Sequence, residues 1–181
     1  MCAKRVKPRR LFLALWPGET ERAMITSLVQ LVPGGRPVCP ANLHMTLVFL
    51  GATTAECLAC YEAALENLKF PTLWLPLDRF GYWPRSRILW LGTNQTPSML
   101  ARLVDDLHRR LKACGFTPEQ RPFHAHITLA RKFPGVVSLP HIKEPLNWQA
   151  NCLTLVESVN QDKGVHYMVL QHWPKDSLTT R

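Results

Sequence analysis

The chain has 181 residues, of which 46% are hydrophobic and 19% are charged. This balance is ordinary for a globular protein and is sufficient to bury a substantial core. No apolar run approaches the length of about 20 residues that spans a bilayer, which argues against membrane insertion. The formal net charge of +9 indicates a basic surface that favours polyanions, among which nucleic acid is the commonest.

The N-terminus mimics a secretory signal, because basic residues 4–10 precede an apolar run over residues 11–15. The apolar run is short, however, and Pro17 and Gly18 follow it without a small-residue cleavage site. We therefore expect a basic tail that enters a first strand, and a cytoplasmic protein that does not associate with a membrane.

Six cysteines are scattered along the chain, at positions 2, 39, 57, 60, 114 and 152. In a cytoplasmic protein these are expected to be reduced thiols. Cys57 and Cys60 form a C-x-x-C sequence, but it falls in a helical pattern and no second pair stands at zinc spacing. We expect neither a metal site nor a redox centre there.

Strands and helices alternate in the first part of the chain. An apolar run predicts a buried strand over residues 10–16, and apolar residues at three-to-four spacing predict a helix over 19–32. A proline-containing loop then leads into a strand over 44–50. Thr53 or Thr54 is a suitable cap for the helix that follows.

The stretch over residues 73–93 predicts two antiparallel strands with a turn around residues 83–87. The clearest helix comes next, with Thr96 as its expected N-cap, Pro97 in its first position and Gly115 as its terminator. Leucines and a valine at helical spacing give this helix one apolar face, and charged residues cover the other.

A strand around residues 126–129 follows, and after a proline-containing loop the segments 152–160 and 165–173 predict a closing hairpin through residues 161–164. The chain contains neither a glycine-rich phosphate loop nor a G-x-S-x-G elbow. Helices interspersed with hairpins indicate an α+β fold whose sheets are mostly antiparallel.

The pattern His-x-Thr-apolar occurs twice, at His44-Met45-Thr46-Leu47 and at His126-Ile127-Thr128-Leu129. Side chains alternate along a strand, so the histidine and threonine of each copy share one face while the apolar residues share the other. If the two strands met across a cleft, two imidazoles and two hydroxyls would surround one small anion. Such a site can cleave a phosphodiester without metal, because one imidazole accepts a proton while the other donates one.

Either copy alone has a structural explanation, since threonine suits strands and a histidine can be satisfied locally. The recurrence favours a paired site, because the copies lie 82 residues apart, one in each half of the chain. His124 shares a strand face with His126, and a His-x-His pair can bind metal. No acidic or cysteine ligand stands nearby in the sequence, so we expect no metal there.

The two motifs resemble those of the two-histidine phosphoesterases, and within them the RNA 2′,3′-cyclic phosphodiesterases, historically called 2′-5′ RNA ligases. The resemblance covers nearly the whole chain. Besides the two motifs it includes these segments: Arg10-Leu11-Phe12, Asn42-Leu43, Leu50-Gly51, Arg85-Ser86-Arg87, Trp90-Leu91-Gly92 and Arg121-Pro122-Phe123-His124. The chain departs from the pattern at Ala125, where relatives often carry proline, but this position supplies no reacting group.

The resemblance implies a bilobal fold in which two mostly antiparallel sheets face each other across a central cleft, with helices on the outside. Residues 1–181 would form a single domain of two pseudo-symmetric lobes with one motif each. No metal or other cofactor is implied.

By the same resemblance, His44 corresponds to the proton donor and His126 to the proton acceptor, although the sequence itself cannot order them. Thr46, Thr128 and Arg131 correspond to phosphate-binding residues. Arg131 has the opposite strand parity to Thr128, so it reaches the cleft only if the strand has ended or bulged by that point.

The implied activity is hydrolysis of RNA 2′,3′-cyclic phosphodiester ends to 2′-phosphomonoesters, with 2′-5′ RNA ligation as the reverse reaction. The expected partner is RNA that carries a 2′,3′-cyclic phosphate or a 2′-5′ linkage, and the expected oligomeric state is a monomer. Two alternatives stay open: a non-catalytic RNA-binding module, and an enzyme of the same fold that acts on 2′-5′ oligonucleotides or cyclic nucleotides. Formation of product distinguishes the implied enzyme from the first alternative. The length and linkage of the substrates that it cleaves distinguish it from the second.

Overall fold

The computed structural model describes residues 7–135, 138–161 and 164–175. Its elements in chain order are β1 (Arg9–Leu15), α1 (Glu19–Val29), β2 (Arg36–Pro37), the 3₁₀ turn η1 (Pro40–Asn42), β3 (Met45–Thr53), α2 (Ala55–Leu65), β4 (Leu73–Leu77), β5 (Arg79–Trp83), β6 (Ile88–Gly92), α3 (Ser98–Lys112), β7 (His126–Arg131), β8 (Leu146–Ala150), β9 (Leu153–Gln161) and β10 (Gly164–Trp173). The start of the expected basic tail, residues 1–6, and the centre of the last hairpin turn, residues 162–163, lie outside the described residues.

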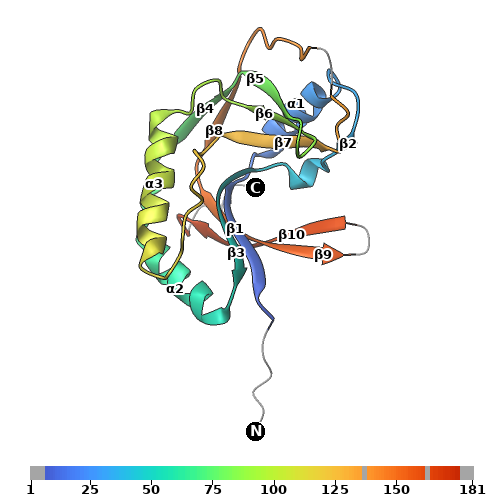
Figure 1. Ribbon diagram of the computed structural model, residues 1–181. Helices are drawn as coiled ribbons and strands as arrows, with labels where there is room; N and C mark the ends of the chain where they lie inside the picture. The colour runs from blue at the N-terminus through green and yellow to red at the C-terminus, as the bar shows by residue number, and fades with distance from the viewer. Residues whose placement is uncertain (1–6, 136–137, 162–163, 176–181) are drawn as a thin grey trace.

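Two four-stranded sheets form the framework (Figure 1). One has the strand order β10-β9-β1-β3, the other has the order β2-β7-β6-β5, and β4 and β8 form a separate two-stranded sheet. Neighbouring strands pair antiparallel in all three sheets of the described chain. The prediction of an α+β fold with mostly antiparallel sheets is therefore confirmed.

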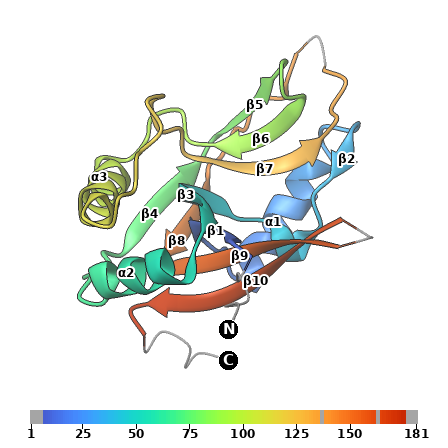
Figure 2. The same cartoon turned by 60° about the horizontal axis from the view of Figure 1, so that its bottom comes forward.

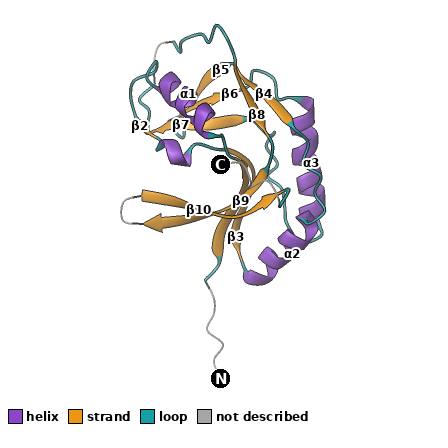
Figure 3. Ribbon diagram, turned by 180° about the vertical axis from the view of Figure 1, so that it is seen from behind, coloured by secondary structure: helices purple, strands orange, loops and turns teal. Residues whose placement is uncertain are grey.

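The helices lie outside these sheets. α2 and α3 lie together along one side of the molecule (Figure 3), whereas α1 lies beside β2 at the other side (Figure 2). The apolar face of α3 is buried as expected, and its last turn carries three basic residues that complement the helix dipole. Among the described residues, no helix has the length and hydropathy needed to cross a membrane.

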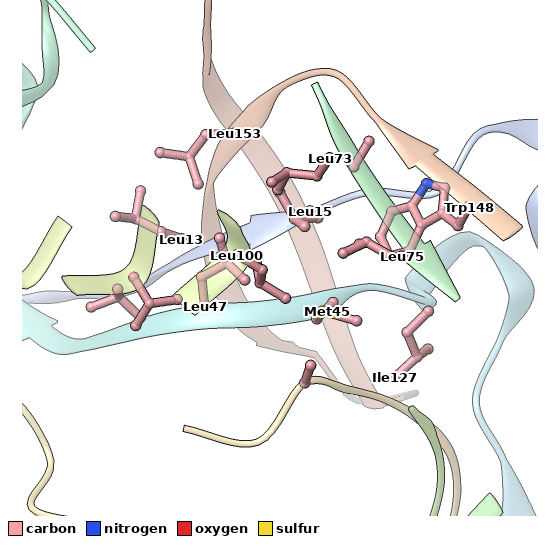
Figure 4. Packing of buried hydrophobic residues seen from close by; sticks show 14 of the residues in the cluster. Leu13, Leu15, Met45, Leu47, Leu73, Leu75, Leu100, Ile127, Trp148 and Leu153 are labelled. Atoms are coloured by element: carbon pink, nitrogen blue, oxygen red, sulfur yellow. The ribbon is translucent and has the colours of Figure 1, made fainter. Parts of the chain in front are cut away.

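The apolar residues of both motifs point into one hydrophobic core. Met45 and Ile127 are fully buried, and Leu47 is nearly so. Figure 4 shows these side chains together with Trp148 of β8. Because a strand alternates its side chains, this burial directs the histidine and threonine of each motif away from the core. The hydrophobic core thus fixes the direction of the polar residues.

Three predicted boundaries are wrong. Residues 73–93 form three strands, because β4 ends at Leu77 and β5 begins at Arg79. The stretch before the closing hairpin contains β8, which was expected to be loop. Pro97 is the N-cap of α3 and not its first residue, while Thr54 caps α2 as predicted, by accepting a hydrogen bond from the Cys57 N–H.

The expectation that the cysteines are reduced thiols is wrong for two of them. Cys60 of α2 and Cys114, just after α3, form a disulfide with a Cα–Cα separation of 5.8 Å. The two helices lie side by side, which brings these positions within the range that a disulfide requires. Cys57 is a free thiol, so the C-x-x-C pair does not close on itself.

This disulfide predicts a measurable contribution to stability. It closes a loop of 54 residues, and a crosslink of that span is expected to raise the free energy of unfolding by about 2–4 kcal/mol by restricting the unfolded chain. Urea unfolding should therefore show a lower stability for Cys60→Ser than for the oxidised wild type. Cys57→Ser, one turn away on the same helix, should leave the stability unchanged; an equal loss in both variants would contradict the crosslink.

Candidate active site

A cleft of about 380 Å³ lies between the two four-stranded sheets. Its lining residues are Arg36, Pro37, Val38, Cys39, Asn42, His44, Thr128, Arg131, Val165 and Tyr167. Residues of β2 and β7 form one wall, and residues just before β3 and on β10 form the other. Segments that lie far apart in the sequence therefore contribute to one concave surface.

His44 lies immediately before β3, and three aromatic rings surround its imidazole. The ring of Trp16 stacks on it at 5.1 Å with an interplanar angle of 11°, and the rings of Phe12 and Tyr167 each lie 5.0 Å away. The Nδ1 atom of His44 lies 2.7 Å from the carbonyl oxygen of Asn42. Since a carbonyl only accepts, Nδ1 carries the proton in this bond and Nε2 is left with a free lone pair.

His126 opens β7 and is held in the same way. Its Nδ1 atom lies 2.7 Å from the carbonyl oxygen of His124, again two residues earlier in the chain. The Trp83 ring contacts the imidazole edge-on at 4.5 Å, and Trp90 packs against His124 at 4.5 Å. Gly81 makes this arrangement possible, because a Cβ atom at that position would fall 1.9 Å from the Trp90 ring.

Both imidazoles are less basic than histidine in water. Burial lowers the pKa of His44 to about 4, the hydrogen bond to Asn42 opposes this shift, and the charges of Arg131 and His126 add to it. Burial also lowers the pKa of His126, against its hydrogen bond to the His124 carbonyl. At pH 7 the unliganded protein therefore holds His44 neutral, with a lone pair available on Nε2.

The threonines follow the alternation predicted from the motif. Thr46 and Thr128 are half-buried, whereas the apolar residues on either side of each are buried. Thr128 lines the cleft together with His44. Thr46 lies on β3 two residues after His44, on the same side of the strand.

Arg131 reaches the cleft because β7 bulges before it. Leu89 of β6 pairs with Ala130, but the next residue, Trp90, pairs with Thr128, so Leu129 is an extra residue in β7. The extra residue reverses the parity of the strand. Arg131 consequently lines the cleft with Thr128, as the resemblance required.

Sequence reasoning missed three residues of the site. Trp16, Arg36 and Tyr167 were not among the site residues expected from the sequence. Trp16 and Tyr167 contact His44 only because β1 and β10 belong to the sheet that β3 extends. Arg36 belongs to a strand of two residues, which has no local pattern to reveal it.

The described residues contain no group of three histidine, cysteine, aspartate or glutamate side chains that could hold a metal ion. The rings of His124 and His126 do lie near each other, with centroids 6.0 Å apart. His124, however, packs against tryptophans rather than beside a third ligand.

The family model described as "LigT like Phosphoesterase" matches the chain twice, over residues 17–90 and 91–167. Each matched segment contains one His-x-Thr motif.

Curated relatives are similar over nearly the whole chain. An RNA 2′,3′-cyclic phosphodiesterase of Escherichia coli is 34% identical over 92% of this chain and 97% of its own. A protein of the same name from Thermus thermophilus is 31% identical over 90% of this chain and 88% of its own. Among solved structures, E. coli LigT complexed with 3′-AMP superposes with a TM-score of 0.84 at 34% identity, covering 92% of this chain and 97% of that one.

Proposed function

The chain belongs to the LigT like phosphoesterase family, and from this premise we propose that it hydrolyses the 2′,3′-cyclic phosphodiester ends of RNA to 2′-phosphomonoesters. One observation supports this most strongly. Two imidazoles, one from each motif, are each oriented by a hydrogen bond from Nδ1 to a backbone carbonyl. Each histidine is followed two residues later by a threonine, and the two motifs belong to different sheets. This is an acid/base pair with hydroxyl donors around a site for one anion.

In the reaction, the proposed proton acceptor is His126. Its Nε2 removes a proton from water as the water oxygen attacks phosphorus in line, and the bond from phosphorus to the ribose 3′ oxygen breaks. His44, protonated at Nε2, donates that proton to the departing 3′ oxygen. The products are a 2′-phosphomonoester and a free 3′ hydroxyl. His126 has gained one proton and His44 has lost one.

Thr46, Thr128 and Arg131 are the proposed ligands of the non-bridging phosphate oxygens. Hydroxyl and guanidinium donors that are already in place stabilise the charge that builds up on these oxygens during attack. Arg131 can form two parallel hydrogen bonds to a phosphate. These bonds would orient the phosphate and compensate its negative charge.

The donor role of His44 depends on the substrate. Its pKa of about 4 keeps it neutral in the free protein at pH 7. An anion bound in the cleft favours the protonated form and raises this pKa. Once protonated, an imidazolium in a poorly hydrated site is a stronger acid than in water, which suits transfer to a leaving alkoxide.

We further propose that the chain acts as a single domain of two pseudo-symmetric lobes and as a monomer, since one chain supplies both motifs. RNA is its partner, and the cytoplasm is the proposed compartment. The same chemistry in reverse would join a 2′,3′-cyclic end to a 5′ hydroxyl through a 2′-5′ linkage. Water at high concentration favours hydrolysis.

An end-group assay tests the function and its independence of metal. An RNA oligomer with a 2′,3′-cyclic end is incubated with the protein in excess EDTA, and the wild type should convert it fully to a 2′-phosphate. His44→Ala and His126→Ala should each lower the rate by at least about a hundredfold, because general acid–base groups typically contribute factors of 10² to 10⁴.

Each other outcome of this assay has a distinct meaning. A 3′-phosphate product would be consistent with the same site, but the leaving group would then be the ribose 2′ oxygen and not the 3′ oxygen. RNA binding without turnover would support the non-catalytic module, and turnover confined to internal 2′-5′ linkages or small cyclic nucleotides would support the related enzyme. Loss of activity in EDTA, with recovery on adding a divalent cation, would contradict the metal-free mechanism.

The lowered histidine pKa values predict the pH dependence. Catalysis needs one neutral and one protonated imidazole, so kcat/KM should be bell-shaped in pH. Both pKa values lie below the ordinary value of 6.5 in the free protein, which places the maximum of kcat/KM below pH 6.5. Bound phosphate raises both values, so the maximum of kcat should lie at higher pH. A kcat/KM profile that rises steadily through pH 8 would contradict this scheme.

A further inference from the structure

Two arginines lie side by side on one wall of the cleft. Arg36 of β2 and Arg131 of β7 are register partners in an antiparallel pair, so their side chains leave the sheet on the same face. Both line the cleft that contains His44 and Thr128. Like charges directly opposite each other destabilise a strand pair, so this arrangement costs the free protein stability.

No carboxylate compensates these two charges. The cleft lining contains no acidic residue, and within the described part of the chain neither Arg36 nor Arg131 forms an ion pair. Other arginines do find partners, as Arg9 does with Glu157 at 2.6 Å. Two unpaired guanidinium groups on one wall indicate a ligand that carries more than one negative charge.

The backbone is shaped to bring Arg36 to this position. Gly35 has a φ of +73°, and a Cβ atom there would lie 2.9 Å from the carbonyl oxygen of Arg131 and 2.9 Å from the Cα of Phe133. Only glycine therefore allows these two segments of the backbone to approach so closely. The Val38 N–H extends the contact by donating to the Leu129 carbonyl at 2.8 Å.

The charges of the substrate match this wall. A 2′,3′-cyclic phosphate carries one negative charge, for which the proposed function already provides Thr46, Thr128 and Arg131. The next negative charge on an RNA chain is the internucleotide phosphate immediately upstream of the cyclic end. Arg36 lines the cleft and is exposed to solvent, so it is accessible to a chain that leaves a site of about 380 Å³.

We propose that Arg36 binds this upstream internucleotide phosphate, so that the site prefers an RNA chain end over a free cyclic nucleotide. This inference rests on the proposed function and assigns the substrate class of the same site. Arg36 is a specificity-determining residue that contacts the substrate away from the reacting atoms, whereas Arg131 contacts the phosphate that reacts.

The test compares two substrates that differ by one upstream nucleotide, and therefore by one internucleotide phosphate: adenosine 2′,3′-cyclic phosphate, and the dinucleotide ApA with a 2′,3′-cyclic end. Arg36→Gln should lower kcat/KM for the dinucleotide by about ten- to a hundredfold, the loss expected for a hydrogen bond to a charged group. It should change kcat/KM for the cyclic nucleotide by less than about twofold, since that substrate lacks the upstream phosphate. Arg131→Gln should impair both substrates.

Matched controls separate this effect from net charge and folding. Arg102→Gln removes an exposed arginine of α3, outside the cleft lining, and should leave both substrates unaffected. Arg36→Lys keeps the charge and should restore part of the dinucleotide preference. The melting temperature of Arg36→Gln should equal or exceed that of the wild type, because one of two opposed like charges is gone.

Equal losses on both substrates, or no loss on either, would overturn the role of Arg36. Wild-type protein inactive on both substrates would instead contradict the proposed function. In that case the binding affinities of adenosine 2′-phosphate and of ApA with a terminal 2′-phosphate, measured calorimetrically, still decide the matter. If Arg36→Gln weakens only the dinucleotide, the inference stands; if it weakens both equally or neither, the inference fails.

Discussion

The bond from each imidazole Nδ1 to a backbone carbonyl two residues earlier is the constraint on which the site depends. At His44 and at His126 the distance is 2.7 Å. Each bond assigns the proton to Nδ1, so Nε2 is the atom left for proton transfer. Aromatic rings pack around both imidazoles and limit their rotation and hydration. The hydrogen bonds therefore orient the imidazoles, whereas burial among the aromatic rings lowers their basicity.

The arrangement of the two sheets brings the two motifs to one site. Burial of Met45 and Ile127 in the core aims the histidine and threonine of each motif outward. Because one motif belongs to each sheet, His44 of the first motif and Thr128 of the second line the cleft between the sheets. Arg36 and Arg131 then make one wall strongly basic. Since neither has an acidic partner within the described chain, this wall is matched to an anionic ligand.

Most of this arrangement could be predicted from the sequence, because it depends on local patterns. Period-two alternation identified both motif strands. The parity of Arg131 required β7 to end or bulge before that residue, and the structure shows a bulge. β8 was missed although Leu146, Trp148 and Ala150 alternate with polar residues. Arg36 and the disulfide between α2 and α3 had no local signal, since they depend on which segments pair in three dimensions.

The central claim is that His44 and His126 act on one phosphate. NMR of the imidazole nitrogens during titration with adenosine 2′-phosphate, the product end group, tests it most directly. We expect both imidazoles to respond along a single saturation curve, and both pKa values, lowered in the free protein, to rise in the complex because a bound anion favours imidazolium. A response from one histidine alone, or two curves with different affinities, would contradict a shared site.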